Sequence, residues 1–156
     1  MVTIVKHEQN HINPTVRFQF VTVSENILEA STSGILSDYD VLLDNCATGS
    51  LFKNDMLLSN IREGPSIVEF NGVGGKLSTN LIGDLQFFGS VPYSPDAPAN
   101  ILSFAEVEDN YKIDFIQTDS FTVSIPVKQG KSKFIKKIKF IRKNKLYDSY
   151  VGKSGK

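Results

Sequence analysis

Only one short stretch of this 156-residue chain favours an α-helix. Within residues 103–109, Ser103 can cap the first turn and Glu106 follows three residues later, as in a capping box. Elsewhere β-branched and aromatic residues alternate with polar ones, most clearly in residues 16–23, which predict a half-buried strand. The sequence therefore predicts an all-β class with one short helix.

Apolar runs and turn residues predict the remaining organisation. Glycine-rich residues 71–75 predict a hairpin tip, and three prolines exclude a helix from residues 92–98. Further strands are expected at 40–44, 67–70, 77–82, 111–115, 121–127, 134–142 and 146–151. We expect one compact domain, in which residues 1–35 form an N-terminal strand and loop extension, 36–116 the core and 117–156 a basic β-hairpin extension.

Composition restricts the setting of the chain. Hydrophobic residues make up 40% of the sequence, and no apolar run approaches the roughly 20 residues that cross a bilayer. We therefore expect no membrane partner. The N-terminus lacks the basic-then-apolar order of a secretory signal, and the single Cys46 cannot form an internal disulfide. Both features favour an intracellular, cytoplasmic location.

The formal net charge of zero conceals an uneven distribution. Residues 1–127 carry 6 Lys/Arg and 16 Asp/Glu, a net charge of −10, whereas residues 128–156 carry 11 Lys/Arg and 1 acidic residue, a net charge of +10. Two interpretations fit the basic region: a nucleic-acid partner, or a solvated hairpin that balances the acidic body. A nucleic-acid partner would be bound by Lys131, Lys133, Lys136, Lys137, Lys139, Arg142 and Lys143.

Residues 7–11, His-Glu-Gln-Asn-His, match the HExxH pattern of zinc proteases in form. That pattern needs a helix to align its two imidazoles on the metal. Here a strand-favouring segment precedes the motif, and Asn10, Asn13 and Pro14 interrupt any helix. We therefore interpret the motif as an exposed polar segment, and we expect no metal site and no cofactor.

Two other motifs lack the residues that their chemistry requires. Residues 72–78 superficially resemble a phosphate-binding loop, but Phe70 stands where its first glycine should be and Leu77 replaces the Ser/Thr that follows the lysine. Cys46 suggests a nucleophile, but no visible pattern places a histidine near it. A hairpin tip and an unreactive thiol are the better interpretations.

An acidic residue ends the apolar strand predicted at 40–44. Asp44 is followed by the turn residues Asn45, Cys46, Ala47 and Thr48. A strand that ends in a small-residue turn can hold a carboxylate fixed, partly desolvated and accessible to substrate. Ordinary Asp-Asn turn chemistry explains the same residues, so this motif alone leaves both interpretations open.

Three motifs follow one another along the chain: Asp-Asn-Cys-Ala-Thr at 44–48, the glycine-rich hairpin at 70–76, and Pro-Ala-Asn-Ile-Leu-Ser at 98–103 before the helix and the strand at 111–115. This order resembles the retropepsin family, the single-domain aspartic proteases of retroviruses and retrotransposons, and is most similar to its copia-type branch. Leu146-Tyr147 resembles the Gly-Leu-Tyr segment between protease and integrase in copia-type polyproteins. The resemblance covers about residues 36–151 and depends on co-linearity.

The resemblance implies a retropepsin-like acid protease barrel with a flap hairpin, one short helix and a C-terminal β extension. It implies that Asp44 is the catalytic residue and that two such aspartates, one from each subunit of a homodimer, share a proton at the two-fold axis. The implied substrate is an extended peptide in a polyprotein, cleaved in the cytoplasm or in virus-like particles. The flap residues that cover it would be Gly72, Val73, Gly74 and Gly75.

Asn45 and Cys46 depart from the family pattern. The family has a hydroxyl residue that locks the two active-site turns together and a glycine where the backbone passes close to the two aspartates. We therefore carry three hypotheses. The chain is an aspartic endopeptidase of a retrotransposon, which we favour, or a catalytically inactive retropepsin-like module for dimerisation or peptide binding, or a nucleic-acid-binding accessory domain.

Overall fold

The computed structural model describes residues 5–7, 15–19, 37–72, 75–116, 120–143 and 146–150. Strands account for most of these residues, and the described part of the chain contains one α-helix, which confirms the all-β class. This helix is too short to cross a membrane. The elements are β1 (Val5–His7), β2 (Thr15–Gln19), β3 (Asp40–Asp44), the 3-10 helix η1 (Asp55–Leu57), β4 (Leu58–Gly72), β5 (Gly75–Leu85), β6 (Gly89–Pro92), β7 (Asn100–Ser103), α2 (Phe104–Asn110), β8 (Lys112–Ile116), β9 (Ser120–Gln129), β10 (Ser132–Lys143) and β11 (Leu146–Tyr150).

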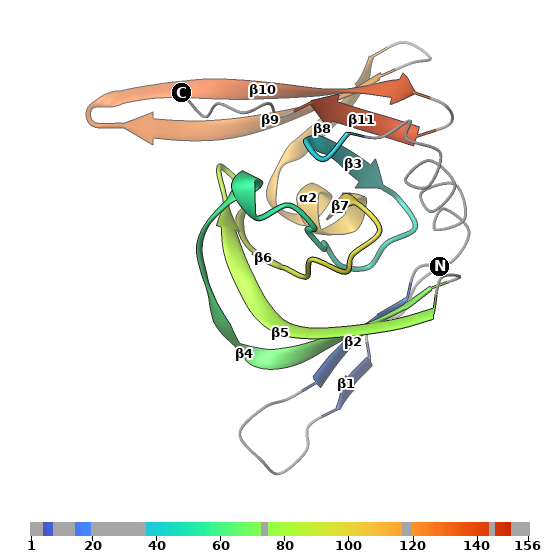
Figure 1. Ribbon diagram of the computed structural model, residues 1–156. Coiled ribbons are helices and arrows are strands. Elements are labelled where there is room, and N and C mark those ends of the chain that lie inside the picture. The colour runs from blue at the N-terminus through green and yellow to red at the C-terminus, as the bar shows by residue number, and fades with distance from the viewer. Residues whose placement is uncertain are drawn as a thin grey trace.

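The strands form two open sheets instead of the expected closed barrel. The first sheet has the order β1-β2-β4-β5-β6, and the second has the order β7-β3-β11-β10-β9-β8. In Figure 1 the curved β4–β5 hairpin lies beneath β3, β7 and α2, and the long β9–β10 hairpin lies above them. Over the described ranges no pairing joins the two outer strands of either sheet, so neither sheet closes on itself.

Residues 51 and 52 join the two sheets through backbone hydrogen bonds. Leu51 exchanges two bonds with Ile101 of β7, of 2.9 and 2.7 Å. Phe52 donates to the carbonyl of Pro92 at the end of β6 and accepts from Ser94, each at 2.9 Å. The chain therefore crosses from one sheet to the other immediately after the turn that follows β3.

The central strand β3 is buried along its whole length. Its sequence, Asp-Val-Leu-Leu-Asp, is apolar at three consecutive positions, as expected for a strand covered on both faces. It pairs in parallel with β7 on one side and antiparallel with β11 on the other. The segment expected as a C-terminal extension, residues 117–156, thus contributes β9, β10 and β11 to the same sheet as β3.

The main core lies between β3, β7, α2 and the β9–β10 hairpin, and Leu85 of β5 and Val91 of β6 also contribute to it. Phe52, Val123 and Phe140 are at most 1% exposed within it, and Val41 and Leu102 pack in the same cluster. Full burial of one such side chain stabilises the fold by roughly 1.5–3 kcal/mol. In β9 the apolar residues Val123 and Ile125 face this core, while Ser120 and Thr122 on the opposite face are also buried.

The β4–β5 hairpin is longer than the strands predicted at 67–70 and 77–82. Gly64 and Pro65 conceal the first half of β4 in the sequence, because neither residue favours a strand interior. The structure accommodates them with register shifts between Ser59 and Arg62 and between Glu63 and Val68, where the ladder is interrupted.

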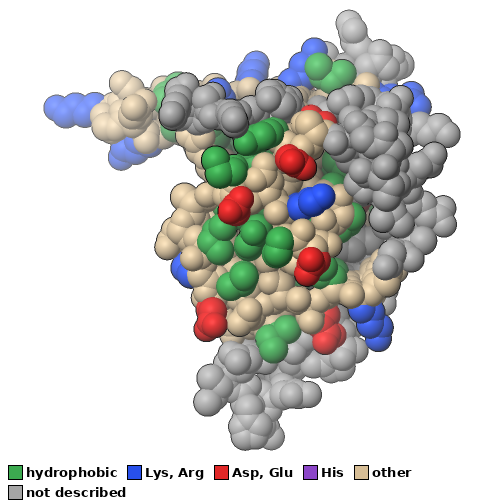
Figure 2. Space-filling model, viewed as in Figure 1, with side chains coloured by type: hydrophobic (Ala, Val, Ile, Leu, Met, Phe, Trp, Pro, Cys, Tyr) green, Lys and Arg blue, Asp and Glu red, His purple; other side chains and the backbone are tan. Residues whose placement is uncertain are grey.

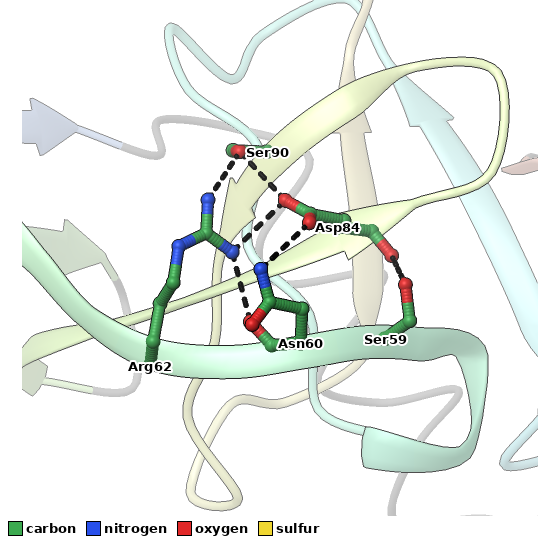
Figure 3. A network of polar contacts seen from close by, with 5 residues as sticks. All are labelled: Ser59, Asn60, Arg62, Asp84 and Ser90. Atoms are coloured by element: carbon green, nitrogen blue, oxygen red, sulfur yellow. Dashed lines mark hydrogen bonds and ion pairs between the residues drawn. The ribbon is translucent and has the colours of Figure 1, made fainter.

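A polar network joins β4, β5 and β6 beside the first register shift of the β4–β5 hairpin (Figure 3). The Asp84 carboxylate accepts from Ser90 Oγ at 2.8 Å, from Arg62 Nη1 at 3.0 Å and from Asn60 Nδ2 at 3.2 Å. These contacts lower the pKa of Asp84, chiefly through the Ser90 hydroxyl and then through Arg62 and Asn60. They join β4, β5 and β6 where backbone pairing is incomplete.

The Asn100 side chain connects β7 with the segments on either side of it. Its Oδ1 accepts from the backbone N–H groups of Lys53 and Asn54, each at 2.9 Å. Its Nδ2 donates to the carbonyls of Asp38 and Asp40, at 2.8 and 3.0 Å. One buried amide therefore satisfies four backbone groups that would otherwise need water.

Replacing Asn100 with alanine should destabilise the fold by about 3–5 kcal/mol, since four backbone groups lose their partner in a buried setting. Urea unfolding of Asn100→Ala and wild type measures the difference. Asn110→Ala is the matched control, because its exposed side chain donates a single bond to Glu106 O. Equal losses in the two variants would contradict the role given to Asn100.

Gly83→Ala should destabilise the fold by about 1–3 kcal/mol through overpacking. A Cβ at this buried position in β5 would lie 2.9 Å from Leu58 Cβ and 3.2 Å from Ile61 Cγ1. Thermal unfolding measures the loss, with Ser78→Ala at an exposed position of β5 as the control. An unchanged melting temperature in Gly83→Ala would show that β4 can move away.

Candidate active site

Asp44 is the last residue of β3 and lies beside Ser103, the last residue of the parallel strand β7. The side chain is 2% exposed. On the other edge of β3, β11 pairs with Asp40, Val41 and Leu42, so this pairing ends two residues before Asp44. The strand predicted at 40–44 has the bounds found in the structure, and its pairing with β7 positions the predicted catalytic residue at the strand end.

The two oxygens of the Asp44 carboxylate differ in their surroundings. Oδ1 accepts the backbone N–H of Cys46 at 2.8 Å. Oδ2 is buried and has no hydrogen-bond partner in the described residues. Burial raises the pKa of Asp44, and the N–H groups of Cys46 and Ala47 only partly offset this effect. Asp44 therefore keeps its proton to a higher pH than an exposed aspartate does.

The predicted turn residues take different positions around this carboxylate. Asn45 is exposed and accepts from the thiol of Cys46, with an Sγ–Oδ1 distance of 3.5 Å. Cys46 is partly buried and Ala47 is buried. Thr48 Oγ1 is buried and, like Asp44 Oδ2, has no hydrogen-bond partner in the described part of the chain. Among the described residues, Asp44 and its turn thus contain two buried oxygens without a hydrogen-bond partner.

Ser103 fixes the turn to β7 and α2. Its hydroxyl donates to the carbonyl of Ala47 at 2.6 Å and accepts from the N–H of Glu106 at 3.3 Å. The second contact confirms the predicted N-cap of the helix. A glycine at this position would provide neither contact, so Ser103 holds the turn after Asp44 in place.

Glu106 does not complete the predicted capping box. Its Oε2 accepts from Ser50 Oγ at 2.7 Å and from Ser50 N at 3.2 Å. Ser50 Oγ in turn accepts from the N–H of Ser103 at 3.0 Å. Burial raises the pKa of Glu106, although both bonds from Ser50 lower it. No local pattern indicates this connection, because 56 residues separate Ser50 from Glu106.

A pocket of about 270 Å³ lies beside this connection. Its lining includes Ser50, Val91, Glu106 and Tyr111, but not Asp44. The pocket is therefore separate from the candidate catalytic carboxylate.

The predicted flap residues lie at the tip of the β4–β5 hairpin. Gly72 pairs with Gly75, while Val73 and Gly74 lie outside the described residues. Gly75 has a φ of +111°, a conformation that favours glycine. Phe70, close to the tip, packs in a buried cluster with Leu51. The hairpin therefore contacts the segment that follows the turn of Asp44.

The HExxH motif lies mostly outside the described residues. His7 ends strand β1, and residues 8–11 are not described. Across the described ranges no group of three or more His, Cys, Asp or Glu side chains is arranged to hold a metal ion.

Comparisons with known proteins give no family assignment: no protein-family model, curated protein or solved structure matches the chain. Function must therefore be argued from the site itself.

Asp44→Asn should stabilise the fold increasingly as pH rises. Because burial raises the pKa of Asp44, its contribution to stability is fully present below the unfolded pKa and is lost as pH rises through the folded pKa. Asparagine does not titrate, so the difference in unfolding free energy should be small near pH 4 and larger at pH 7.5. Urea unfolding at several pH values measures it.

Asp96→Asn removes one carboxylate from an exposed position and serves as the control. If the stability gained by Asp44→Asn becomes smaller as pH rises, burial does not disfavour the ionised carboxylate of Asp44, and the prediction is wrong.

Proposed function

We propose that this chain is an aspartic endopeptidase of a retrotransposon, with a catalytic pair formed by Asp44 and the same residue of a second copy. One observation carries the proposal. The carboxylate of Asp44 is fixed at the end of a buried strand, with one oxygen held by the turn and the other without a partner in the described residues. A second carboxyl group that shares a proton would be such a partner.

The proposed chemistry follows from this shared proton. Two adjacent carboxylates do not both ionise, because their charges repel each other in a poorly solvated site. The ionised carboxylate removes a proton from water, which attacks the peptide carbonyl carbon. The protonated carboxyl group donates its proton to the carbonyl oxygen or to the leaving amine. The chain contains one such aspartate turn, so the pair requires a homodimer with a two-fold axis.

Two arrangements support the proposal. The catalytic strand, the glycine hairpin and the strand-helix segment occur in the family's order, and Phe70 packs the hairpin against Leu51 beyond the catalytic turn. Asn45 is exposed and therefore available to a second copy. The pairing of β2 with β4 over Ile67–Asn71 limits where the substrate can bind, so an extended peptide that pairs with the hairpin would use β5 or replace β2.

A second candidate is a retropepsin-like module without catalysis, which would dimerise or bind peptides. Two observations favour it. Asp44 is 2% exposed in the single chain, so neither water nor peptide reaches its carboxylate there. Cys46 stands in the position that the family gives to glycine, and its N–H is the group that holds Asp44 Oδ1. A side chain there can displace the reacting carboxylate.

Cleavage of a diverse peptide pool from about pH 4 to 7 distinguishes the candidates, because the shared proton limits activity to that range. If the chain is a protease, wild type cleaves and Asp44→Asn does not. Cys46→Gly should then cleave up to about 100-fold faster, because removing the Cys46 side chain relieves a small displacement of the Asp44 carboxylate, and such displacements can change rates by that factor. Sedimentation of each variant determines whether it is a dimer.

Cleavage retained in Asp44→Asn would overturn the proposal. A wild-type dimer without cleavage at any pH, together with an inactive Cys46→Gly dimer, would establish the second candidate.

A further inference from the structure

The β9–β10 hairpin carries positive charge without any acidic residue. Residues 120–143 contain eight Lys/Arg and no Asp or Glu, whereas residues 37–116 contain 4 Lys/Arg and 12 Asp/Glu. The hairpin extends beyond the core toward its tip (Figure 1), and Lys and Arg side chains gather around that end of the surface (Figure 2). Its cations are Lys128, Lys131, Lys133, Lys136, Lys137, Lys139, Arg142 and Lys143.

The pairing register of β9 and β10 shows which side chains of the hairpin face the core and which face outward. Ile138 pairs with Val123 and Phe140 with Phe121, and these residues pack on the core. Because side chains alternate between the faces of a strand, the intervening residues of β10 face away from the core. The outward face therefore presents four exposed lysines: Lys128, Lys133, Lys137 and Lys139.

These lysines have no counter-charge within the described residues. The described ion pairs join Arg62 to Asp84 and Lys112 to Asp114, and neither lies on the hairpin. Lys128 and Lys133 stand directly opposite each other in the register, an arrangement of like charges that destabilises a strand pair. An anion bound across this face would remove that repulsion.

The spacing of the outward face fits a linear polyanion. Successive residues on one face of a strand are about 7 Å apart, so Lys133, Lys137 and Lys139 form a row along β10. Between them, Ile135 is 59% exposed, and at the end of the row Ile141 is 53% exposed. Ser124, opposite Lys137, adds a hydroxyl that can donate to phosphate oxygens.

We propose that the outward face of the β9–β10 hairpin binds the phosphate backbone of nucleic acid, without reading its sequence. Lysines act here as point charges that neutralise phosphates and release counterions. A row of like charges on an extended hairpin suits a long polymer better than a compact acidic group. This proposal is independent of proteolysis by Asp44, because the two regions share no residue.

Fluorescence anisotropy with a labelled 20-nucleotide RNA tests the proposal, using single-stranded and duplex forms between 50 and 300 mM salt. Four phosphate contacts predict that log K falls with log salt with a slope of about −3 for a single strand. Lys137→Gln/Lys139→Gln should reduce this slope by about 1 for each lysine and weaken binding equally for unrelated sequences. Comparing single strand with duplex shows which form supplies the phosphates.

Lys53→Gln/Lys76→Gln is the matched control, because it removes two exposed lysines from the acidic body. Absent or salt-insensitive binding, or equal weakening in the control, would overturn the proposal. Tighter binding of a polyglutamate peptide than of the RNA, at equal charge and equal salt, would also overturn it, in favour of an acidic protein partner. Self-association lost in the hairpin variant, without RNA binding, would assign the face to a second copy of this chain.

Discussion

The position of the candidate catalytic strand depends on the two end residues of β7. Asn100, at the start of β7, binds the carbonyls of Asp38 and Asp40 before and at the start of β3. Ser103, at the end of β7, binds the carbonyl of Ala47 after β3. The parallel pairing thus holds the strand along its length, and two side chains hold its entry and exit. Backbone groups at both ends are satisfied without solvent, which allows this region to be buried.

This arrangement separates what is fixed around Asp44 from what is variable. The Cα position of Asp44 follows from the pairing of β3 with β7, while the direction of its carboxylate follows from backbone N–H groups of the turn, chiefly that of Cys46. Cys46 supplies that N–H, so its side chain affects the carboxylate through the backbone and not through its own chemistry. The fold can therefore persist while the reactivity of Asp44 changes, which is why fold and catalysis need separate evidence.

Local sequence patterns predicted the elements whose own residues determine their conformation. The bounds of β3 match residues 40–44, the helix begins one residue after the predicted cap, and the glycines place the hairpin tip. The first half of β4 was missed, because its strand conformation depends on partners in β5 and β6 and contradicts the preferences of Gly64 and Pro65. Within the site, Asp44 was found as a strand end, whereas the contacts of Ser50, Asn100 and Glu106 depend on residues far away in the sequence.

The pairing of β11 with β3 has a consequence for the order of folding during synthesis. One edge of β3 pairs with β11, where Leu42 lies opposite Asp148. The other edge of β3 pairs with β7. As the chain emerges from the ribosome, β3 appears first, gains β7 about sixty residues later, and keeps an open edge until residues 146–150 have been made. A nascent chain therefore exposes one unpaired edge of this apolar strand until β11 has been translated, although Asp44 itself already has its partner in β7.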